Sequence, residues 1–236
     1  MVLKYLTLAL SLTLTPEITS MTTQQLSSAQ ILMSPVSGIP LTVTEIEEHS
    51  HKRDDDSVAV DYTVTAKQYR DSAGRVRIES KIINPEGKKL RGLTVSITDP
   101  IAGFQAVLAN DAKTAYRLTI GKSFGNARLF FADAADGQDL PHQWKVAQED
   151  AESQTIQGYS FKGSRIVTSA EDAPNLTTTF SQWYSDQLKL FGAIERSGPE
   201  KSYTVRIQQL EFGEPDHALF EIPADYRVVD IEMPQP

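Results

Sequence analysis

The sequence predicts a mainly β fold: a curved antiparallel sheet or half-open β-barrel of roughly ten strands, with a short C-terminal helical plug. Apolar and polar residues alternate with a period of two in many short segments, which is typical of strands with one buried face. Asp, Asn, Gly and Pro turn signals separate these segments, and helical periodicity is almost absent. An antiparallel meander explains all three observations.

The clearest local signal is a hairpin around residues 69–79. Asp71 suits the first position of a type I turn, and Gly74 can adopt the positive φ that closes a hairpin with a bulge. Apolar residues alternate before and after the turn, which predicts one buried face on each strand. These residues are Val58, Val60, Tyr62, Val64 and Ala66 before the turn, and Val76, Ile78 and Ile82 after it.

The remaining strands are expected on both sides of an irregular segment at 121–150, which is long for a connection and predicts a short helix near 127–135 or a loop over one face of the sheet. Near the C-terminus, Pro215 suits the first turn of a short helix. Leu219, Phe220 and Ile222 would then plug an open end of the sheet. The other predicted strands are 41–46, 93–97, 104–108, 116–120, 155–161, 165–169, 177–184, 188–195, 203–208 and 227–231.

The N-terminus has the layout of a secretory signal peptide. Lys4 precedes an apolar run of about nine residues that is too short to span a bilayer. We expect a signal peptide at 1–20, with cleavage there or as late as 29, a polar linker at 21–38 and a single antiparallel β domain at 39–236. This arrangement predicts a periplasmic or secreted protein with no integral membrane segment after signal removal.

Composition excludes several classes of function. The formal net charge of −8 is spread along the chain, so no clustered basic face predicts a nucleic-acid partner. The chain contains no cysteine, which rules out disulfides, thiolate metal sites and a cysteine nucleophile. The 40% hydrophobic content is sufficient for a folded core.

One cluster has the residue types of a metal site. Glu47, His49 and His51 would project from the same face of a strand, and two imidazoles with a carboxylate can hold zinc or copper. The polar run 52–56 follows at once, however, and favours a solvated hairpin tip. We therefore predict no metal and no cofactor.

Catalytic motifs are missing. There is no Gly-x-Ser-x-Gly elbow, and Gly121-Lys122-Ser123 lacks the first glycine of a phosphate-binding loop. Paired carboxylates for glycoside chemistry are always available among 31 acidic residues, so they indicate nothing specific. We predict that the protein is not an enzyme and has no catalytic residues.

The densest apolar patch lies in the predicted strand pair at 177–195. On adjacent strands its aromatic and aliphatic side chains could line a curved sheet and bind an apolar ligand. The competing interpretation is ordinary core packing. The candidate lining residues are Phe180, Trp183, Tyr184, Leu190 and Phe191.

Three stretches in order, 69–75, 183–189 and 213–226, resemble a family of uncharacterised secreted β-rich proteins of acidobacteria and related soil bacteria. Such proteins distantly resemble periplasmic lipoprotein carriers and outer-membrane lipoprotein receptors of the LolA/LolB type. That resemblance implies a curved antiparallel sheet around an apolar cavity, and it transfers no catalytic residue. The sequence departs from the carriers in its scarce helical material and in the acidic segment 49–56.

The function expected from these patterns is an exported non-enzymatic protein that binds an apolar or lipid-like ligand, such as a lipid or lipidated peptide, in the concave face of its sheet. A structural or protein-interaction β domain with a filled core is the alternative. A hydrolase of unknown type is the second alternative.

Overall fold

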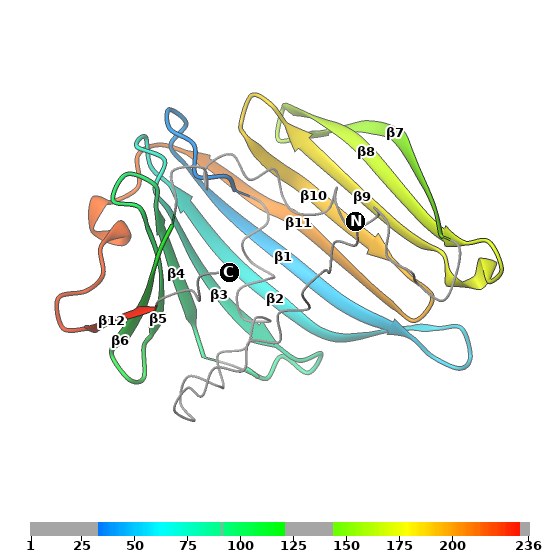
Figure 1. The fold of residues 1–236 in the computed structure, drawn as a ribbon, viewed down its shortest axis with the longest axis horizontal. Helices are drawn as coiled ribbons and strands as arrows, with labels where there is room; N and C mark the ends of the chain where they lie inside the picture. The colour runs from blue at the N-terminus through cyan, green and yellow to red at the C-terminus, as the bar shows by residue number, and fades with distance from the viewer. Residues whose placement is uncertain (1–32, 91, 121–143, 232–236) are drawn as a thin grey trace, which may run out of the picture.

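The computed structural model describes residues 33–90, 92–120 and 144–231, and places them in one open sheet of 12 strands. The strand order is β12-β6-β5-β4-β3-β2-β1-β11-β10-β9-β8-β7, and only the pairing of β12 with β6 is parallel among the pairs described (Figure 1). The strands are β1 (Leu41–Lys52), β2 (Val58–Arg70), β3 (Val76–Ile83), β4 (Thr94–Asp99), β5 (Phe104–Ala109), β6 (Thr114–Thr119), β7 (Trp144–Ile156), β8 (Tyr159–Ala170), β9 (Thr178–Ser185), β10 (Leu190–Ser197), β11 (Lys201–Phe212) and β12 (Arg227–Ile231).

The prediction of a curved, mainly antiparallel sheet is confirmed; the sheet has 12 strands where a total of roughly ten was expected, and the predicted bounds differ most around β7 and β8. The residues from Trp144 to Asp150 belong to β7 and not to an irregular connection. The sequence around Gln157 and Gly158 forms the turn between β7 and β8, and both residues have positive φ. This turn contains neither proline nor aspartate, so the turn signals used on the sequence did not detect it. The predicted helix at 127–135 lies outside the described residues.

The predicted hairpin turn is confirmed. The Gly74 amide donates to the Asp71 carbonyl at 3.1 Å, and Gly74 has φ +88°. The Asp71 side chain accepts from the Arg75 amide at 2.8 Å and pairs with the Arg75 guanidinium at 2.5 Å. The buried Asp71 carboxylate therefore stabilises the turn that sets the register of β2 and β3.

The predicted apolar face of β2 is wrong at its beginning. The register with β1 shifts between His49 and Ser50, so that Tyr62 lies opposite His49 while Val60 lies opposite Ser50. This β-bulge moves Val58 and Val60 to the other face, where they are 67% and 39% exposed. Alternation predicts a face only as far as the next bulge.

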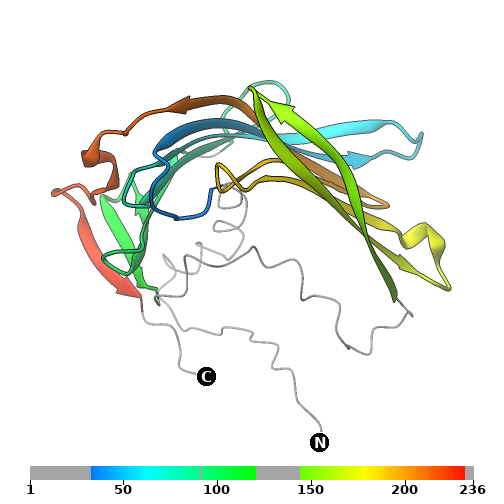
Figure 2. The same ribbon diagram turned by 90° about the horizontal axis from the view of Figure 1, so that it is seen from above.

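The sheet bends into an arch, and the part of it formed by β9 and β10 passes beneath the inner face of β1, β2 and β11 (Figure 2). The inner face is the face of β1 that carries Leu41 and Val43. The pairing of β10 with β11 covers only Ala193 to Ser197 on β10, so the strands separate before that point. The inner core forms between the two layers: it includes Leu41 and Val43 from β1 together with Leu188, Leu190 and Trp183.

A second core lies on the opposite face. Val76 and Ile78 of β3 pack in the inner core, but they lie opposite Thr98 and Ser96 of β4, which places the apolar residues of β4 on the outer face. These residues form the outer core, consisting of Val95, Ile97, Leu108 and Ala115, with Phe104, Ile222 and Tyr226 packed against it.

The C-terminal segment 213–226 covers the outer core, and does not plug an end of the sheet as predicted. Its helical content is a short 3-10 turn, η4 (His217–Phe220), in which the Asp216 side chain accepts from the Ala218 amide. Phe220 is buried, while Leu219 is partly exposed. The apolar residues of β4 to β6 that form the outer core point outward, and this segment is what removes them from water.

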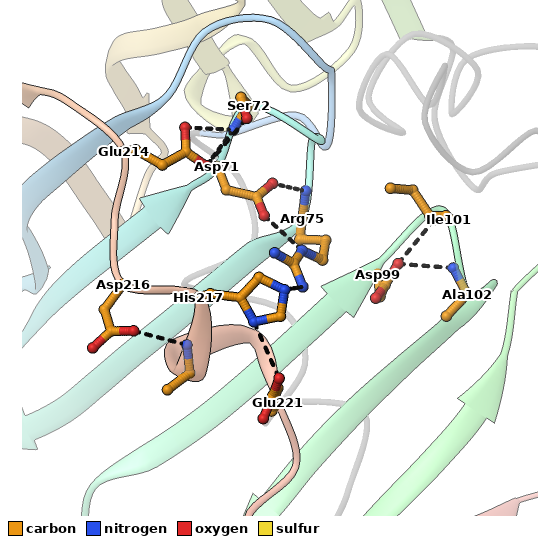
Figure 3. A network of polar contacts seen from close by, with 11 residues as sticks. Asp71, Ser72, Arg75, Asp99, Ile101, Ala102, Glu214, Asp216, His217 and Glu221 are labelled. Atoms are coloured by element: carbon orange, nitrogen blue, oxygen red, sulfur yellow. Dashed lines mark hydrogen bonds and ion pairs between the residues drawn. The ribbon is translucent and has the colours of Figure 1, made fainter.

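A polar network attaches the segment to the hairpin turn (Figure 3). The Ser72 amide and hydroxyl donate to Glu214, and Arg75 Nη1 lies 3.1 Å from His217 Nε2. Arg77 on β3 donates to the Leu219 carbonyl at 3.0 Å. Asp99, at the end of β4, caps the next turn by accepting from the backbone amides of Ile101 and Ala102.

No helix among the described residues is long and apolar enough to cross a membrane. The predicted signal peptide falls in residues 1–32, outside the described part of the chain.

Candidate binding face on the inner side of the sheet

Strand β1 carries a polar strip at the centre of the inner face. Its inward side chains change from apolar to polar along the strand, from Leu41 and Val43 to Glu45, Glu47 and His49. Residues directly opposite one another in an antiparallel pair share a face. The neighbours of Glu45 and Glu47 on that face are therefore Ala66 and Val64 of β2, and Ile207 and Val205 of β11.

Glu45 and Glu47, the acidic pair, are 2% and 3% exposed. The pKa of Glu45 is raised to about 8: burial is the main cause, a hydrogen bond with Gln68 acts in the opposite direction, and the neighbouring Glu47 adds to the increase. Glu45 therefore carries a proton at neutral pH. The Oε2 atoms of both glutamates are buried without a hydrogen-bond partner. Unsatisfied polar atoms of this kind are costly in a fold and call for an explanation.

The strip opens toward solvent at His49. Its Nε2 atom contacts Glu47 Oε1, and its ring stacks between Tyr62 and Tyr203 at centroid distances of 4.3 and 5.5 Å. Burial raises the pKa of both tyrosines, and the nearby Glu47 raises each further, although Arg196 lowers that of Tyr203. The three rings are partly exposed, so they form the accessible end of the strip.

The three rings belong to a row that crosses the sheet. Cross-strand pairing places His49 opposite Tyr62 and Tyr203, Tyr203 opposite Arg196, and Arg196 opposite Phe180. We call these five residues the aromatic row. All of its members are at least partly exposed on one face of β2, β1, β11, β10 and β9.

The five predicted lining residues divide between the two faces of β9 and β10. Phe180 and Tyr184 alternate with Trp183 along β9, and Phe191 lies opposite Tyr184, with ring centroids 4.9 Å apart. Phe180, Tyr184 and Phe191 thus share the inner face and are partly exposed. Trp183 and Leu190 instead lie in the inner core, where the Trp183 indole donates to the Glu152 carbonyl at 2.9 Å.

The structure does not gather the three metal-like residues into one site. Within the described ranges, no group of three or more His, Asp and Glu side chains is placed to hold a metal ion. His51 contacts Asp61 at 2.5 Å, while His49 contacts Glu47. The turn at 53–57 is solvated, as predicted, but Glu47 is buried. Continuing the alternation of Leu41 and Val43 by two more steps places Glu47 on the same face of β1, and the flanking strands β2 and β11 bury it there.

Comparisons with known proteins give similarity in fold only. No protein-family model matches the sequence, and no curated protein matches it. The crystal structure of MucB in complex with MucA(peri) is 12% identical with a TM-score of 0.37, and the match covers 82% of this chain and 57% of that chain. Lipoprotein LppX of Mycobacterium tuberculosis is 9% identical, with a TM-score of 0.33 over 72% of this chain and 86% of that one. A LolA superfamily protein from Nitrosomonas europaea is 7% identical, with a TM-score of 0.31 over 79% and 91% of the two chains.

A LolA superfamily protein is among the structural neighbours. At these identities and TM-scores, the likeness assigns no ligand or partner to this chain. The resemblance to an acidobacterial family stays a prediction.

Proposed function

We propose that this chain is an exported, non-enzymatic binding protein, and that an apolar or amphipathic ligand binds along the inner face of its sheet. The observation that carries the proposal is the set of partly exposed aromatic side chains on that face. Phe180, Tyr184 and Phe191 share it with Tyr203 and Tyr62. Aromatic rings that remain accessible on the hollow side of a sheet offer a large area for contact with an apolar molecule.

The burial of the rest of the apolar surface supports this choice of face. The outer core is covered by the chain's own C-terminal segment, whose Ile222 and Tyr226 pack against it and whose Phe220 is itself buried. The aromatic side chains on the inner face of β9 and β10 are only partly buried by the residues around them. Covering them with ligand would contribute roughly 25 cal/mol for each Å² of apolar surface removed from water.

One edge of the sheet argues against the protein-interaction alternative. Strand β7 forms this edge, with β12 at the other, and the pairing of β7 with β8 is interrupted between Ala151 and Gln154. The carbonyl of Glu152 in this bulge already accepts from Trp183. Bulges and acidic side chains, here Glu149 and Asp150, are the features that discourage edge-to-edge pairing.

A hydrolase finds no support in the described histidines. His49, His51 and His217 each contact a carboxylate at a different place in the fold, and the three do not converge on one site.

A neutral fluorescent probe tests the proposal. N-phenyl-1-naphthylamine should gain fluorescence on titration with the wild-type protein, and Phe191→Ser and Phe180→Ser should each weaken its binding about tenfold. Val58→Ser, which removes an exposed apolar side chain from the outer face, is the matched control and should bind like wild type. Absence of probe binding, together with native mass spectra free of co-purified lipid, would refute the function.

A further inference from the structure

We infer that the acidic pair selects ligands that carry a primary ammonium group, which Glu45 and Glu47 bind from the inner face. The inference rests on the proposed function, since it names the chemical class of the ligand for the same face. An ammonium group has three donors and no acceptor, which complements two carboxylate oxygens that lack donors.

The first support is the arrangement of the two unpartnered oxygens. Glu45 and Glu47 are two residues apart on one strand and share a face, so their Cα atoms are about 7 Å apart. One Oε2 atom on each is buried without a partner, although Gln68 and His49 occupy other positions on the carboxylates. One ammonium group between these side chains would donate to both oxygens. Charge-assisted hydrogen bonds of this type are about twice as strong as neutral ones.

The second support is that no cationic side chain among the described residues lies beside the acidic pair and donates to the two Oε2 atoms. On β2 the residues beside the acidic pair are Ala66 and Val64, and on β11 they are Ile207 and Val205. Arg70 lies on the same face near the start of β1, but its guanidinium donates to backbone carbonyl groups. Arg196 of the aromatic row is exposed.

The third support is the nature of the open end. The route to the acidic pair passes the stacked rings of Tyr62, His49 and Tyr203, and all three are partly exposed. The faces of tyrosine rings attract organic cations through their quadrupole. Anionic ligands meet the opposite situation, because Glu47 repels them and no described cation on the strip compensates.

Proton release provides a specific signature. Glu45 holds a proton at neutral pH because burial raises its pKa, and its charged neighbour is Glu47. Glu47 in turn interacts with His49, Tyr62 and Tyr203. An arriving ammonium favours the carboxylate form, so the Glu45 proton passes to the buffer while the ligand keeps all its N–H bonds. Binding at pH 7 should therefore release about one proton for each ligand.

The experiment is isothermal titration of the full chain with three probes of one chain length: decylamine, decanol and decanoate. We expect decylamine to bind at least about tenfold more tightly than decanoate, and to release protons when buffers of different ionisation enthalpy are compared. Glu45→Gln should bind decylamine without proton release, and Glu47→Gln should bind it about tenfold more weakly. Glu48→Gln changes the same chemistry on the exposed opposite face of β1, and should behave like wild type.

Decanol separates the two levels of the proposal. If decanol binds to wild type and to both variants but decylamine shows no advantage that depends on Glu45 or Glu47, the ammonium site is refuted and the apolar function stands. If no probe binds, the proposed function itself is refuted. Thermal unfolding of each variant identifies folding defects. If Glu47→Gln does not fold, the comparison of wild type with Glu45→Gln decides, because this variant keeps the shape and neutral charge of the protonated side chain.

Discussion

Arg70 Nη2 donates to the carbonyl oxygen of Leu188 at 2.6 Å, across 118 positions of sequence. The same buried guanidinium donates to the carbonyl oxygens of Ile39, Ser34 and Lys189. The end of β2 is thereby attached both to the segment that precedes β1 and to the β9–β10 turn. Burial lowers the pKa of Arg70 to about 10, which still leaves it charged at neutral pH. This one side chain holds together the two layers that enclose the inner core.

Replacing Arg70 by lysine should destabilise the protein by about 3 kcal/mol or more, because a single ammonium cannot reach all these carbonyl groups and leaves some of them buried without donors. Urea unfolding measures the change. The control is Arg206→Lys, which alters an exposed pair with Glu195 and should cost less than about 1 kcal/mol. Equal effects of the two substitutions would contradict the structural role of Arg70.

Gly74→Ala should be more harmful than Gly87→Ala, although both glycines have positive φ. A Cβ atom at Gly74 would lie 2.9 Å from the Ser37 amide nitrogen and 2.9 Å from the Val36 carbonyl carbon, whereas nothing lies within 4 Å at Gly87. We expect about 1 kcal/mol of destabilisation at Gly87 from backbone strain, and about 3 kcal/mol at Gly74. Thermal or urea unfolding measures the loss of stability in each variant. Similar losses at both positions would show that the backbone at residues 36–37 moves away from the new Cβ atom at little cost.

Glu45→Gln should change how stability depends on pH. The folded protein keeps the Glu45 proton up to about pH 8, while the unfolded chain releases it near the ordinary glutamate pKa of 4.5. The folded state thus binds more protons in this window, so the wild-type free energy of unfolding should fall by about 1.4 kcal/mol per pH unit as the pH rises through it. The variant should lack this contribution and be the more stable protein at pH 8.

Urea unfolding between pH 5 and pH 9 measures this difference, with Glu48→Gln as the control on the exposed face of β1. An unchanged pH slope in Glu45→Gln would mean that Glu45 is already ionised in the folded protein.

Phe220→Ala should release the C-terminal segment from the outer core. The buried ring packs beneath Arg75, whose guanidinium lies 5.0 Å from the ring centroid, and its loss should cost about 3 kcal/mol. Hydrogen exchange should accelerate in β4 and β5, because the outer core becomes accessible to water. Leu219→Ala, at a partly exposed neighbouring position, should have a smaller effect. Unchanged exchange in β4 and β5 would show that the outer core needs no cover.

Local patterns predicted much of the architecture. The turn from Asp71 to Gly74 has the expected hydrogen bonds, and the final strand β12 has the expected bounds. One failure comes from a local irregularity: the bulge at Asp61 reverses the alternation of β2, and periodicity contains no signal for it. The division of the predicted lining residues follows from alternation itself, since Trp183 and Leu190 point to the other face of β9 and β10 from Phe180, Tyr184 and Phe191.

Alternating polarity and turn chemistry act over a few residues, and they were sufficient to determine a curved antiparallel sheet and its hairpin register. The placement of buried charge depends instead on contacts between distant segments. Glu47 belongs to a polar cluster with His49 and His51 in the sequence, yet it and Glu45 are buried because β2 and β11 flank them and β1 carries them on its inner face. Only the tertiary structure decided this, since desolvation is a property of all the atoms around a group and not of its neighbours in the chain.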